Sequence, residues 1–442
     1  MTEHDAHSAG LERALAAGYD DAAVQALRLW PVDSRAKSVP AAWWGLTTDE
    51  VVATRTTLTE LPTPIVTIDA TALAHNLTVM AQWCADRGVH LAPHGKTTMA
   101  PQLFARQLSL GAWGITAATT TQVAVMRSVG ITRILLANEL IDPVSLAWIG
   151  EELTADPSFE FYCYVDSVRG VELMDAALHG VGRPVNVLVE VGRPGGRAGS
   201  RTLAESLAIA GAVAQTSTLR LAGVAGYEGS YAHDLTAEAF DAVEGFLRGM
   251  RRTVAAFAQQ GLFDGLAEVI VSAGGSAYFD QVADVLSEPW DLPQAVTVVL
   301  RSGAYVAHDD GHYLLLSPFG RGGETVTPFK PALHAWARVL SRPEPRLAIL
   351  DAGKRDVAYD LDLPVAQRVR RSDGTTTAAT DCVVTSVNDQ HLFLSVSPEV
   401  VLEVGDVVRL GLSHPCTVFD KWQLLPVVDD DGIVVDLVRT FF

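Results

Sequence analysis

One lysine stands out for the chemistry that its surroundings allow. Lys96 lies in the stretch LAPHGKTTMAP, residues 91–101, where an apolar run ends abruptly at Pro-His-Gly. A lysine that is partly enclosed by apolar walls and lies near other charges can lose its proton near neutral pH. The free amine can then attack an aldehyde. A solvated loop lysine is the commoner case, so this interpretation depends on what else the fold brings to Lys96.

A glycine turn follows a later apolar run. In VSAGGSAYFD the run ends at Ser272 and continues into Gly274, Gly275 and Ser276. Glycines let backbone N–H groups converge on the oxygens of a phosphate, and a helix start nearby adds its dipole. Because ordinary turns also need glycine, only its position in the fold makes this turn a candidate phosphate site.

Tyr227 lies between the lysine and this turn, in GVAGYEGSY. Glycines on either side would let a planar ligand approach closely, and the ring could stack on another aromatic ring. A core tyrosine with a hydrogen-bonded hydroxyl is the alternative interpretation.

A histidine and a cysteine form the second constellation, in GLSHPCTVFDKW. His414 and Cys416 are one residue apart, and on a strand such residues face the same side. Nitrogen plus soft sulfur favours zinc, with other divalent metals possible. Two protein ligands would leave positions for water or substrate, as in catalytic sites, although a buried cysteine beside a hydrogen-bonded histidine also arises by chance. The other cysteines show no disulfide or zinc-finger spacing and are expected in the core; they are Cys84, Cys163 and Cys382.

The elements that must position these residues alternate regularly from Leu61 onward. Short β-branched runs are separated by longer amphipathic stretches, which predicts a parallel sheet covered by helices. Eight such units match the length of a (β/α)8 TIM barrel, with an open doubly wound sheet as the alternative. The strand candidates are PIVTI, VHLAP, AWGIT, RILLA, FYCYV, VNVLVEV, LAGVAGY and EVIVSAG.

Three regions follow from this pattern. Residues 1–60 are expected to form an N-terminal arm, partly helical over 11–29. Residues 61–325 would form the α/β barrel, and residues 326–442, which alternate like antiparallel strands, a C-terminal β domain. Barrel enzymes carry their functional groups at the C-terminal ends of strands, and loops after the seventh and eighth strands frequently bind phosphate. A lysine, a glycine turn and a tyrosine at such ends together predict a site for pyridoxal 5′-phosphate (PLP).

The composition of the chain limits the kinds of molecule that it is expected to bind. The chain of 442 residues carries a formal net charge of −19, which disfavours nucleic acid and anionic membrane surfaces. No apolar run approaches membrane-spanning length, and the start, MTEHDAHSAG, lacks the basic and apolar regions of a secretory signal. We therefore expect a cytoplasmic enzyme with a small-molecule substrate and no membrane partner.

Six motifs together resemble a known family. APHGKTTMAP, GYEG, SAGG, RSGAYVAHD, DAG and SHPCTVFDKW occur in the order found in the fold-type III, alanine racemase-like PLP enzymes, specifically the D-serine dehydratase and D-threonine aldolase group, which is amino acid deaminase-like. The resemblance covers about residues 61–442. It implies that Lys96 is the Schiff-base lysine, that Tyr227 packs against the cofactor, and that His414 and Cys416 bind the metal. It also implies a phosphate loop at Gly274, Gly275 and Ser276, with Tyr305 near the phosphate and Arg197 near the cofactor.

Some positions depart from the family pattern. Ala92 stands where an arginine is usual, Thr98 and Met99 replace a His-Lys pair, and Arg355 stands where a lysine is expected. These differences bear on the substrate more than on the cofactor.

The resemblance implies a D-serine ammonia-lyase-like β-elimination. Lys96 would release PLP to the substrate amine and act as base at Cα, while zinc would help the β-hydroxyl leave; the products would be a 2-keto acid and ammonia. The alternative is D-threonine aldolase-type retro-aldol cleavage to glycine and an aldehyde. In that reaction's enzymes a carboxylate tends to replace the cysteine, so Cys416 favours elimination. A non-catalytic PLP-binding protein is a further alternative, which the added β domain disfavours. The family also implies a homodimer.

Overall fold

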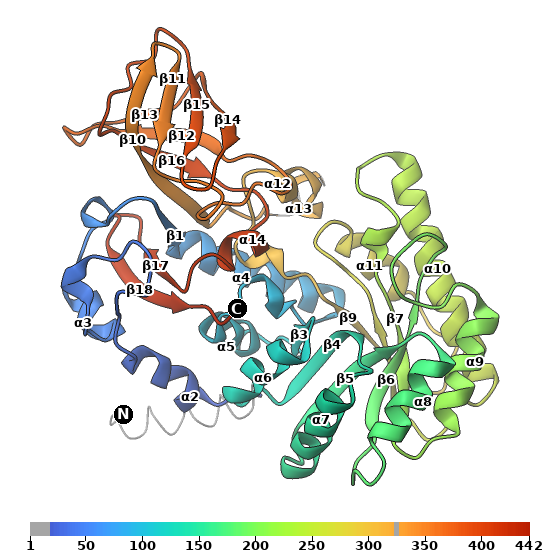
Figure 1. Cartoon of the computed structure of the whole chain (residues 1–442). Coiled ribbons are helices and arrows are strands. Elements are labelled where there is room, and N and C mark those ends of the chain that lie inside the picture. Colours follow the sequence, from blue (N-terminus) through green and yellow to red (C-terminus); the bar gives the residue numbers. More distant parts are fainter. Residues whose placement is uncertain (1–17, 322–326) are drawn as a thin grey trace. The chain divides into compact units, whose positions relative to one another are not determined.

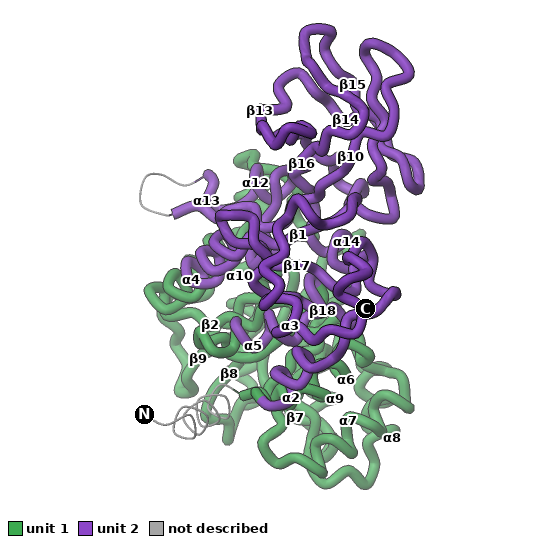
Figure 2. Tube along the Cα trace, turned by 90° about the vertical axis from the view of Figure 1, so that its left-hand side faces the viewer, with its two compact units in different colours: residues 1–21, 81–96, 107–303 green, residues 22–80, 97–106, 304–442 purple. Residues whose placement is uncertain are grey.

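The computed structural model describes residues 18–321 and 327–442. Two compact units make up the chain, and the backbone passes between them several times (Figure 2). Of the described residues, the first unit contains 18–21, 81–96 and 107–303. The second contains 22–80, 97–106 and the residues from 304 onward. Lys96 therefore ends a segment of the first unit, and Thr97 begins a segment of the second.

An eight-stranded parallel sheet forms the centre of the first unit (Figure 1). Its order is β2-β9-β8-β7-β6-β5-β4-β3. The strands are β2 (His90–Leu91), β3 (Ile115–Ala117), β4 (Arg133–Glu139), β5 (Glu160–Val165), β6 (Val185–Val191), β7 (Leu219–Gly226), β8 (Glu268–Ser272) and β9 (Ala295–Leu300).

Backbone hydrogen bonds join the two ends of this sheet. Trp113 N donates to Leu91 O over 2.7 Å and Thr116 N to Pro93 O over 3.0 Å, and His94 forms an isolated parallel bridge with Thr116. Small and branched side chains fill the interior, as in a packed barrel; they include Ala92, Leu135, Leu188, Ala225, Ile270 and Val299. The predicted α/β barrel is thus confirmed.

The strand count was right, but one strand was wrong. The first candidate, PIVTI, is β1 (Ile65–Asp69), which lies in the sheet of the second unit, antiparallel to β10 (Leu333–Glu344). The eighth barrel strand is β9, the run AVTVVL, which the sequence analysis missed. Tyr227 and the Gly274 turn therefore follow the sixth and seventh barrel strands rather than the seventh and eighth. A short apolar run has the same sequence pattern whether it forms a barrel strand or a strand of the other sheet. Which strands it pairs with depends on residues far away in the chain.

Helices connect consecutive barrel strands (Figure 1). The longest, α10, begins after the cap Thr236, whose hydroxyl accepts from Ala239 N. Its buried residues, including Val243, Leu247, Met250, Val254 and Phe257, recur every three to four positions and form one apolar stripe. α4 (Ala70–Arg87) leads from β1 into β2. The helices between successive barrel strands are α5 (Pro101–Ser109), α6 (Thr120–Ser128), α7 (Pro143–Ala155), α8 (Val168–Ala177), α9 (Leu203–Ala214), α10 (Ala237–Gln259) and α11 (Phe279–Leu286).

The second unit is built on a ten-stranded, mainly antiparallel sheet, and this confirms the expected C-terminal β domain. Its main path is β13-β12-β16-β10-β1-β17-β18, and β11, β15 and β14 branch from β10. These strands are β11 (Leu347–Leu350), β12 (Val365–Arg370), β13 (Thr376–Ala378), β14 (Cys382–Val387), β15 (Leu392–Val396), β16 (Val407–Gly411), β17 (Leu424–Val428) and β18 (Val434–Arg439). Its short helices are α2 (Asp21–Ala26), which begins one residue before the unit boundary, α3 (Thr48–Ala53), α12 (His312–Leu316), α13 (Pro318–Arg321) and α14 (Cys416–Phe419).

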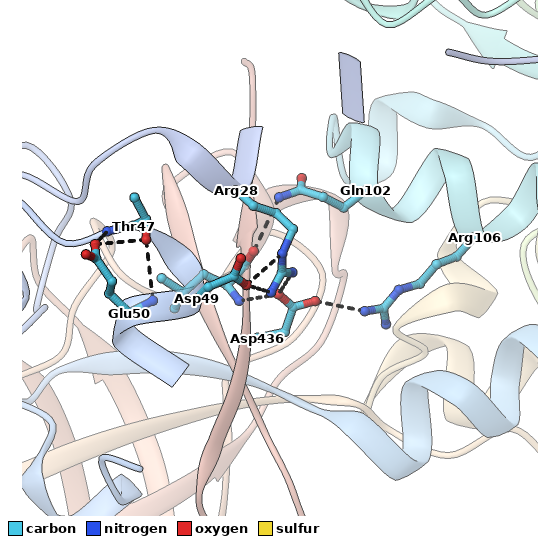
Figure 3. Close-up of polar contacts among 8 residues, drawn as sticks. Arg28, Thr47, Asp49, Glu50, Gln102, Arg106 and Asp436 are labelled. Carbon is cyan, nitrogen blue, oxygen red and sulfur yellow. Dashed lines mark hydrogen bonds and ion pairs between the residues drawn. The ribbon is translucent and has the colours of Figure 1, made fainter. Parts of the chain in front are cut away.

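Part of the N-terminal arm belongs to this second unit. The expected helix over 11–29 lies partly outside the described residues, and its described part is α2 followed by a 3-10 turn at Leu27–Leu29. Arg28 from this turn donates to Asp436 of β18 over 2.6 Å and to Asp49 of α3 over 2.5 Å (Figure 3). Arg106 of α5 donates to the other oxygen of Asp436 over 3.0 Å. Asp436 therefore joins the arm, the last strand and the helix that follows Lys96 in the chain.

The remaining cysteines behave as expected. All four cysteines are free, and Cys84, Cys163 and Cys382 are buried. Among the described residues, no helix combines the length and apolarity needed to span a bilayer.

Candidate active site

Lys96 lies at the C-terminal end of the first barrel strand. After β2 the chain passes through Pro93 and His94 into a 3-10 turn, Gly95–Thr97, which presents the exposed Lys96 side chain. His94 is half-buried, and its Nδ1 atom has no hydrogen-bond partner among the residues that the structure describes. Burial, together with the positive charges of Lys96 and Arg301, holds the pKa of His94 well below its usual value.

Tyr227 follows β7, and its ring fills the space that the neighbouring glycines leave. A Cβ atom on Gly229 would lie 2.4 Å from the Tyr227 hydroxyl, and one on Gly275 would lie 2.9 Å from the ring. The glycines therefore accommodate the protein's own tyrosine, which differs from the expectation that they admit a planar ligand. The guanidinium carbon of Arg197 lies 4.7 Å from the ring centroid, within cation–π range. The structure thus brings Arg197, Tyr227 and the glycine turn together.

A buried carboxylate holds the glycine turn. Glu228, the residue after Tyr227, is fully buried. Its Oε2 atom accepts from Gly274 N over 2.9 Å and its Oε1 atom from Gly275 N over 2.5 Å. Gly274 has a φ of +99°, in the region that favours glycine. Successive N–H groups in such a turn form an anion-binding concavity, and here an anion of the chain itself occupies it. Ser276, the next residue, is half-buried.

Arg301 supports the same end of the barrel. It follows β9, is buried, and donates from Nη1 to Ser272 Oγ and from Nη2 to Gly226 O, each over 2.6 Å. Its backbone N–H donates to Gly274 O over 3.0 Å. One arginine thus ties together the ends of β7, β8 and β9. A Lys side chain could not reproduce this forked geometry.

Two carboxyl groups lie at the ends of strands β4 and β6. Glu139 ends β4, and Glu190 lies one residue before the end of β6. Burial, and then the neighbouring Glu190, raise the pKa of Glu139 to about 8. Asp166, just after β5, accepts from Gly199 N over 3.1 Å and so holds the loop that carries Arg197. A carboxyl group with a raised pKa, such as that of Glu139, is typical of functional sites.

These residues fit PLP. Lys96 offers an amine at a strand end, and Tyr227 offers a ring braced by a cation. The turn after β8, whose Gly274 and Gly275 amides bind Glu228, continues through Ser276 toward α11 and is the candidate phosphate site. Tyr305 belongs to the second unit, where a 3-10 turn, Ala304–Val306, buries it with its ring centroid 5.8 Å from that of Phe329.

His414 and Cys416 lie in the second unit, where the geometry differs from the expected strand. β16 ends at Gly411, His414 has a φ of +51°, and Cys416 begins α14. Pro415 separates them and favours this turn. The two side chains nevertheless interact. Burial acts to lower the pKa of His414, but Cys416 and Asp360 outweigh it and raise the pKa to about 9.

Asp360 orients the imidazole of His414. Its Oδ2 lies 2.5 Å from His414 Nδ1, and its Oδ1 accepts from Thr417 Oγ1 over 2.8 Å. Burial acts to raise the pKa of Asp360, but the contacts with Thr417 and His414 lower it. The Cys416 thiol donates to Thr97 Oγ1 over 3.3 Å, and Thr97 directly follows Lys96 in the chain.

Asp309 fixes the backbone of this turn. The buried carboxylate accepts from His414 N over 3.1 Å through Oδ2. Its Oδ1 accepts from Gly311 N, Tyr313 N and Leu314 N, at the start of α12. A non-glycine residue at positive φ is costly, and this bond helps to hold His414 there.

The donor set fits a metal held by two protein ligands. Because Asp360 engages Nδ1, Nε2 is the nitrogen left for a metal, and a carboxylate on the far side of the ring is the usual support for such a histidine. Within residues 18–321 and 327–442, no group of three or more His, Cys, Asp or Glu side chains is placed to hold a metal ion. Should a metal bind here, His414 and Cys416 would be the residues that hold it.

Sequence reasoning missed several of these residues. Glu228, Arg301, Glu139, Glu190, Asp309 and Asp360 were not singled out. A charged residue that directly ends or follows an apolar strand was the available signal, as in RILLANE and VVLR. No local pattern marks Asp360, which lies 54 residues before its partner His414.

Two family models match the chain. The model described as alanine racemase, N-terminal domain, matches residues 68–283. The model described as a putative serine dehydratase domain matches residues 332–428.

Curated relatives match most of the chain. A D-threonine aldolase from Arthrobacter sp. is 30% identical over 383 residues, covering 86% of this chain and 92% of that protein. A 3-hydroxy-D-aspartate aldolase from Paracoccus denitrificans (strain Pd 1222) is 25% identical, covering 82% and 88%.

Solved structures agree. The crystal structure of a D-threonine aldolase from Filomicrobium marinum matches with a TM-score of 0.71 and 25% identity, covering 87% of this chain and 96% of that one. D-threo-3-hydroxyaspartate dehydratase from Delftia sp. HT23 matches with a TM-score of 0.69 and 25% identity, covering 87% and 99%. The chain belongs to the fold-type III, alanine racemase-like family of PLP enzymes, in the group of the D-threonine aldolases and D-serine dehydratases.

Proposed function

We propose that the chain is a PLP- and zinc-dependent lyase that eliminates water from D-serine or a related β-hydroxy-D-amino acid, giving a 2-keto acid and ammonia. The names of the relatives support this substrate class. D-Threonine and 3-hydroxy-D-aspartate both carry an amino group at Cα and a hydroxyl at Cβ, which are the two groups that the reaction uses.

The chain's residues divide this work between them. Bound PLP would supply an electron sink for the charge left at Cα. Lys96 would hold the cofactor and, once released, its amine would take the α-proton. Tyr227, braced by Arg197, would pack on the cofactor ring, and the turn at Gly274, Gly275 and Ser276 would receive the phosphate, with Tyr305 near it. His414 and Cys416 would hold a zinc ion, which supplies Lewis acidity toward the β-hydroxyl.

The pairing of Cys416 with His414 is the observation that favours β-elimination over retro-aldol cleavage. A thiolate and an imidazole form a soft donor set that suits zinc better than manganese or magnesium. The pair does not stand alone, because Asp360 orients the histidine and the thiol contacts Thr97, the residue bonded to Lys96. This second link supports a common role for the metal ligands and the lysine.

Retro-aldol cleavage is the second candidate, and the relative from Arthrobacter favours it. The match to that D-threonine aldolase covers 86% of this chain at 30% identity. The two reactions demand opposite proton chemistry at Cβ. Elimination needs the hydroxyl to leave with a proton, whereas cleavage needs the hydroxyl proton to be removed.

Product analysis separates the candidates. The purified protein, supplied with PLP and zinc, is incubated with D-serine, D-threonine and D-threo-3-hydroxyaspartate, and keto acids, ammonia, glycine and aldehydes are quantified. We expect keto acid and ammonia in equal amounts. Glycine plus acetaldehyde from D-threonine, without keto acid, would replace elimination by cleavage. No turnover of any substrate would favour a PLP-binding protein without catalysis.

A cysteine variant tests the metal. Cys416→Ala should lose both bound zinc and turnover, while Cys382→Ala, at a buried cysteine of β14, serves as the matched control and should keep both. Zinc lost with turnover retained would remove the metal from the mechanism.

A further inference from the structure

The glycine turn after β8 already binds an anion, the carboxylate of Glu228. Both of its oxygens accept backbone N–H groups, from Gly274 and from Gly275. The side chain is fully buried, so these donors are shielded from water. A buried carboxylate without such donors would carry a large desolvation cost.

The surrounding packing makes this arrangement rigid. A Cβ on Gly275 would lie 2.9 Å from the Tyr227 ring and 3.2 Å from Glu228 Oε1. On the other side of the turn, Ser302 Oγ donates to Gly275 O over 2.8 Å and Arg301 N donates to Gly274 O over 3.0 Å. The turn is thus held on its N–H side by Glu228 and on its C=O side by the segment after β9.

We propose that Glu228 is a positioning residue for the cofactor's phosphate: it permanently satisfies the amides of Gly274 and Gly275, so that the donors offered to the phosphate begin at Ser276. This inference rests on the proposed function, because it assumes that the turn receives PLP. In this proposal the two glycines do not bind the phosphate directly. Their amides bind Glu228, and this contact holds the turn in place.

The role of Glu228 can be tested by measuring how much the phosphate group contributes to cofactor binding. Pyridoxal carries the same ring and aldehyde as PLP but no phosphate, so the ratio of the two dissociation constants reports the phosphate site alone. Each is measured by absorbance titration of the wild-type protein freed of cofactor, and of Glu228→Gln. The glutamine keeps the volume, but its NH2 group faces a backbone N–H and leaves one donor unpaired.

We expect Glu228→Gln to weaken PLP binding about tenfold or more, the usual size for an unpaired buried donor, and to leave pyridoxal binding within about twofold. Glu60→Gln is the matched control, because that exposed carboxylate also accepts a backbone N–H, from Thr57 over 2.8 Å. It should change neither constant.

Other outcomes contradict the inference in distinct ways. Equal weakening of PLP and pyridoxal binding, or no change in either, would show that Glu228 has no specific role at the phosphate. Tighter PLP binding in Glu228→Ala would show that the carboxylate competes with the phosphate for the same donors. A wild-type protein that binds neither compound would overturn the proposed function, and this inference with it.

Hydrogen exchange gives a second test that needs no variant to fold. In the wild-type protein, the amides of Gly274 and Gly275 should be protected equally with and without PLP, and protection of the Ser276 amide should rise when PLP is added. If the Gly274 and Gly275 amides were protected only when PLP is bound, this would contradict the proposal that Glu228 binds them permanently.

Discussion

Replacing Glu139 by glutamine should change how the stability of the protein depends on pH. The pKa of Glu139 is raised to about 8, first by burial and then by Glu190, while an unfolded glutamate titrates near about 4.3. Between these values the folded state holds a proton that the unfolded state has lost. The wild-type protein therefore loses stability as pH rises through this window, and the loss is complete above about pH 8.

The size of the loss follows from the shift. One pKa unit corresponds to about 1.4 kcal/mol, and a shift of more than three units would give roughly 5 kcal/mol for an isolated buried group. Glu139 is only partly buried and lies beside Glu190, so we expect on the order of 3 kcal/mol. Glutamine cannot ionise and avoids this loss.

Urea unfolding followed by tryptophan fluorescence measures the effect. Glu139→Gln should be more stable than the wild type by on the order of 3 kcal/mol at about pH 9, and equal to it at about pH 4 or below. Glu151→Gln, at an exposed glutamate of α7, is the control and should follow the wild type at both pH values. The reasoning is refuted if the difference between Glu139→Gln and the wild type is the same at both pH values.

Two further substitutions test contacts in the second unit. Asp360→Asn should weaken zinc binding about 10- to 100-fold, because the carboxylate orients the metal-binding imidazole; Asp362→Asn, a neighbour whose carboxylate contacts Ser413 rather than His414, should leave it unchanged. Because Asp360 also helps to raise the pKa of His414 to about 9, the chelator competition is run at about pH 10, where His414 is largely deprotonated in both proteins. Equal zinc affinity in the two variants would contradict this role. Asp436→Asn should lower the free energy of unfolding by about 2 kcal/mol, since the 15% exposed carboxylate binds both Arg28 and Arg106. Asp49→Asn, 68% exposed, should cost less than about 0.5 kcal/mol, and similar losses in both would rule out a special role for Asp436.

Local sequence patterns predicted the strands and helices better than they predicted which strands pair with each other. The alternation of apolar runs with amphipathic stretches indicated a barrel and a C-terminal β domain, because the spacing of apolar residues along the chain follows the period of the strand or helix that buries them. The same signal could not tell that PIVTI pairs with β10, because that pairing joins Ile65 to Trp336 across the chain.

The candidate site divides in the same way. Lys96, Tyr227 and the Gly274 turn were found because each follows an apolar strand. Glu228 was overlooked, although it lies beside Tyr227, since only the fold brings it to the amides of the turn after β8. Asp360 was overlooked for the same reason. Carboxylates that position other groups act through distant partners, and spacing along the chain does not record them.

Borohydride trapping tests the central claim most directly. The protein is loaded with PLP, its visible spectrum is recorded, and the complex is reduced with borohydride, digested and mapped by mass spectrometry. We predict a visible band that reduction abolishes and a phosphopyridoxyl label on Lys96. A label on another lysine, or no label, would contradict the assignment of Lys96 as the residue that holds the cofactor.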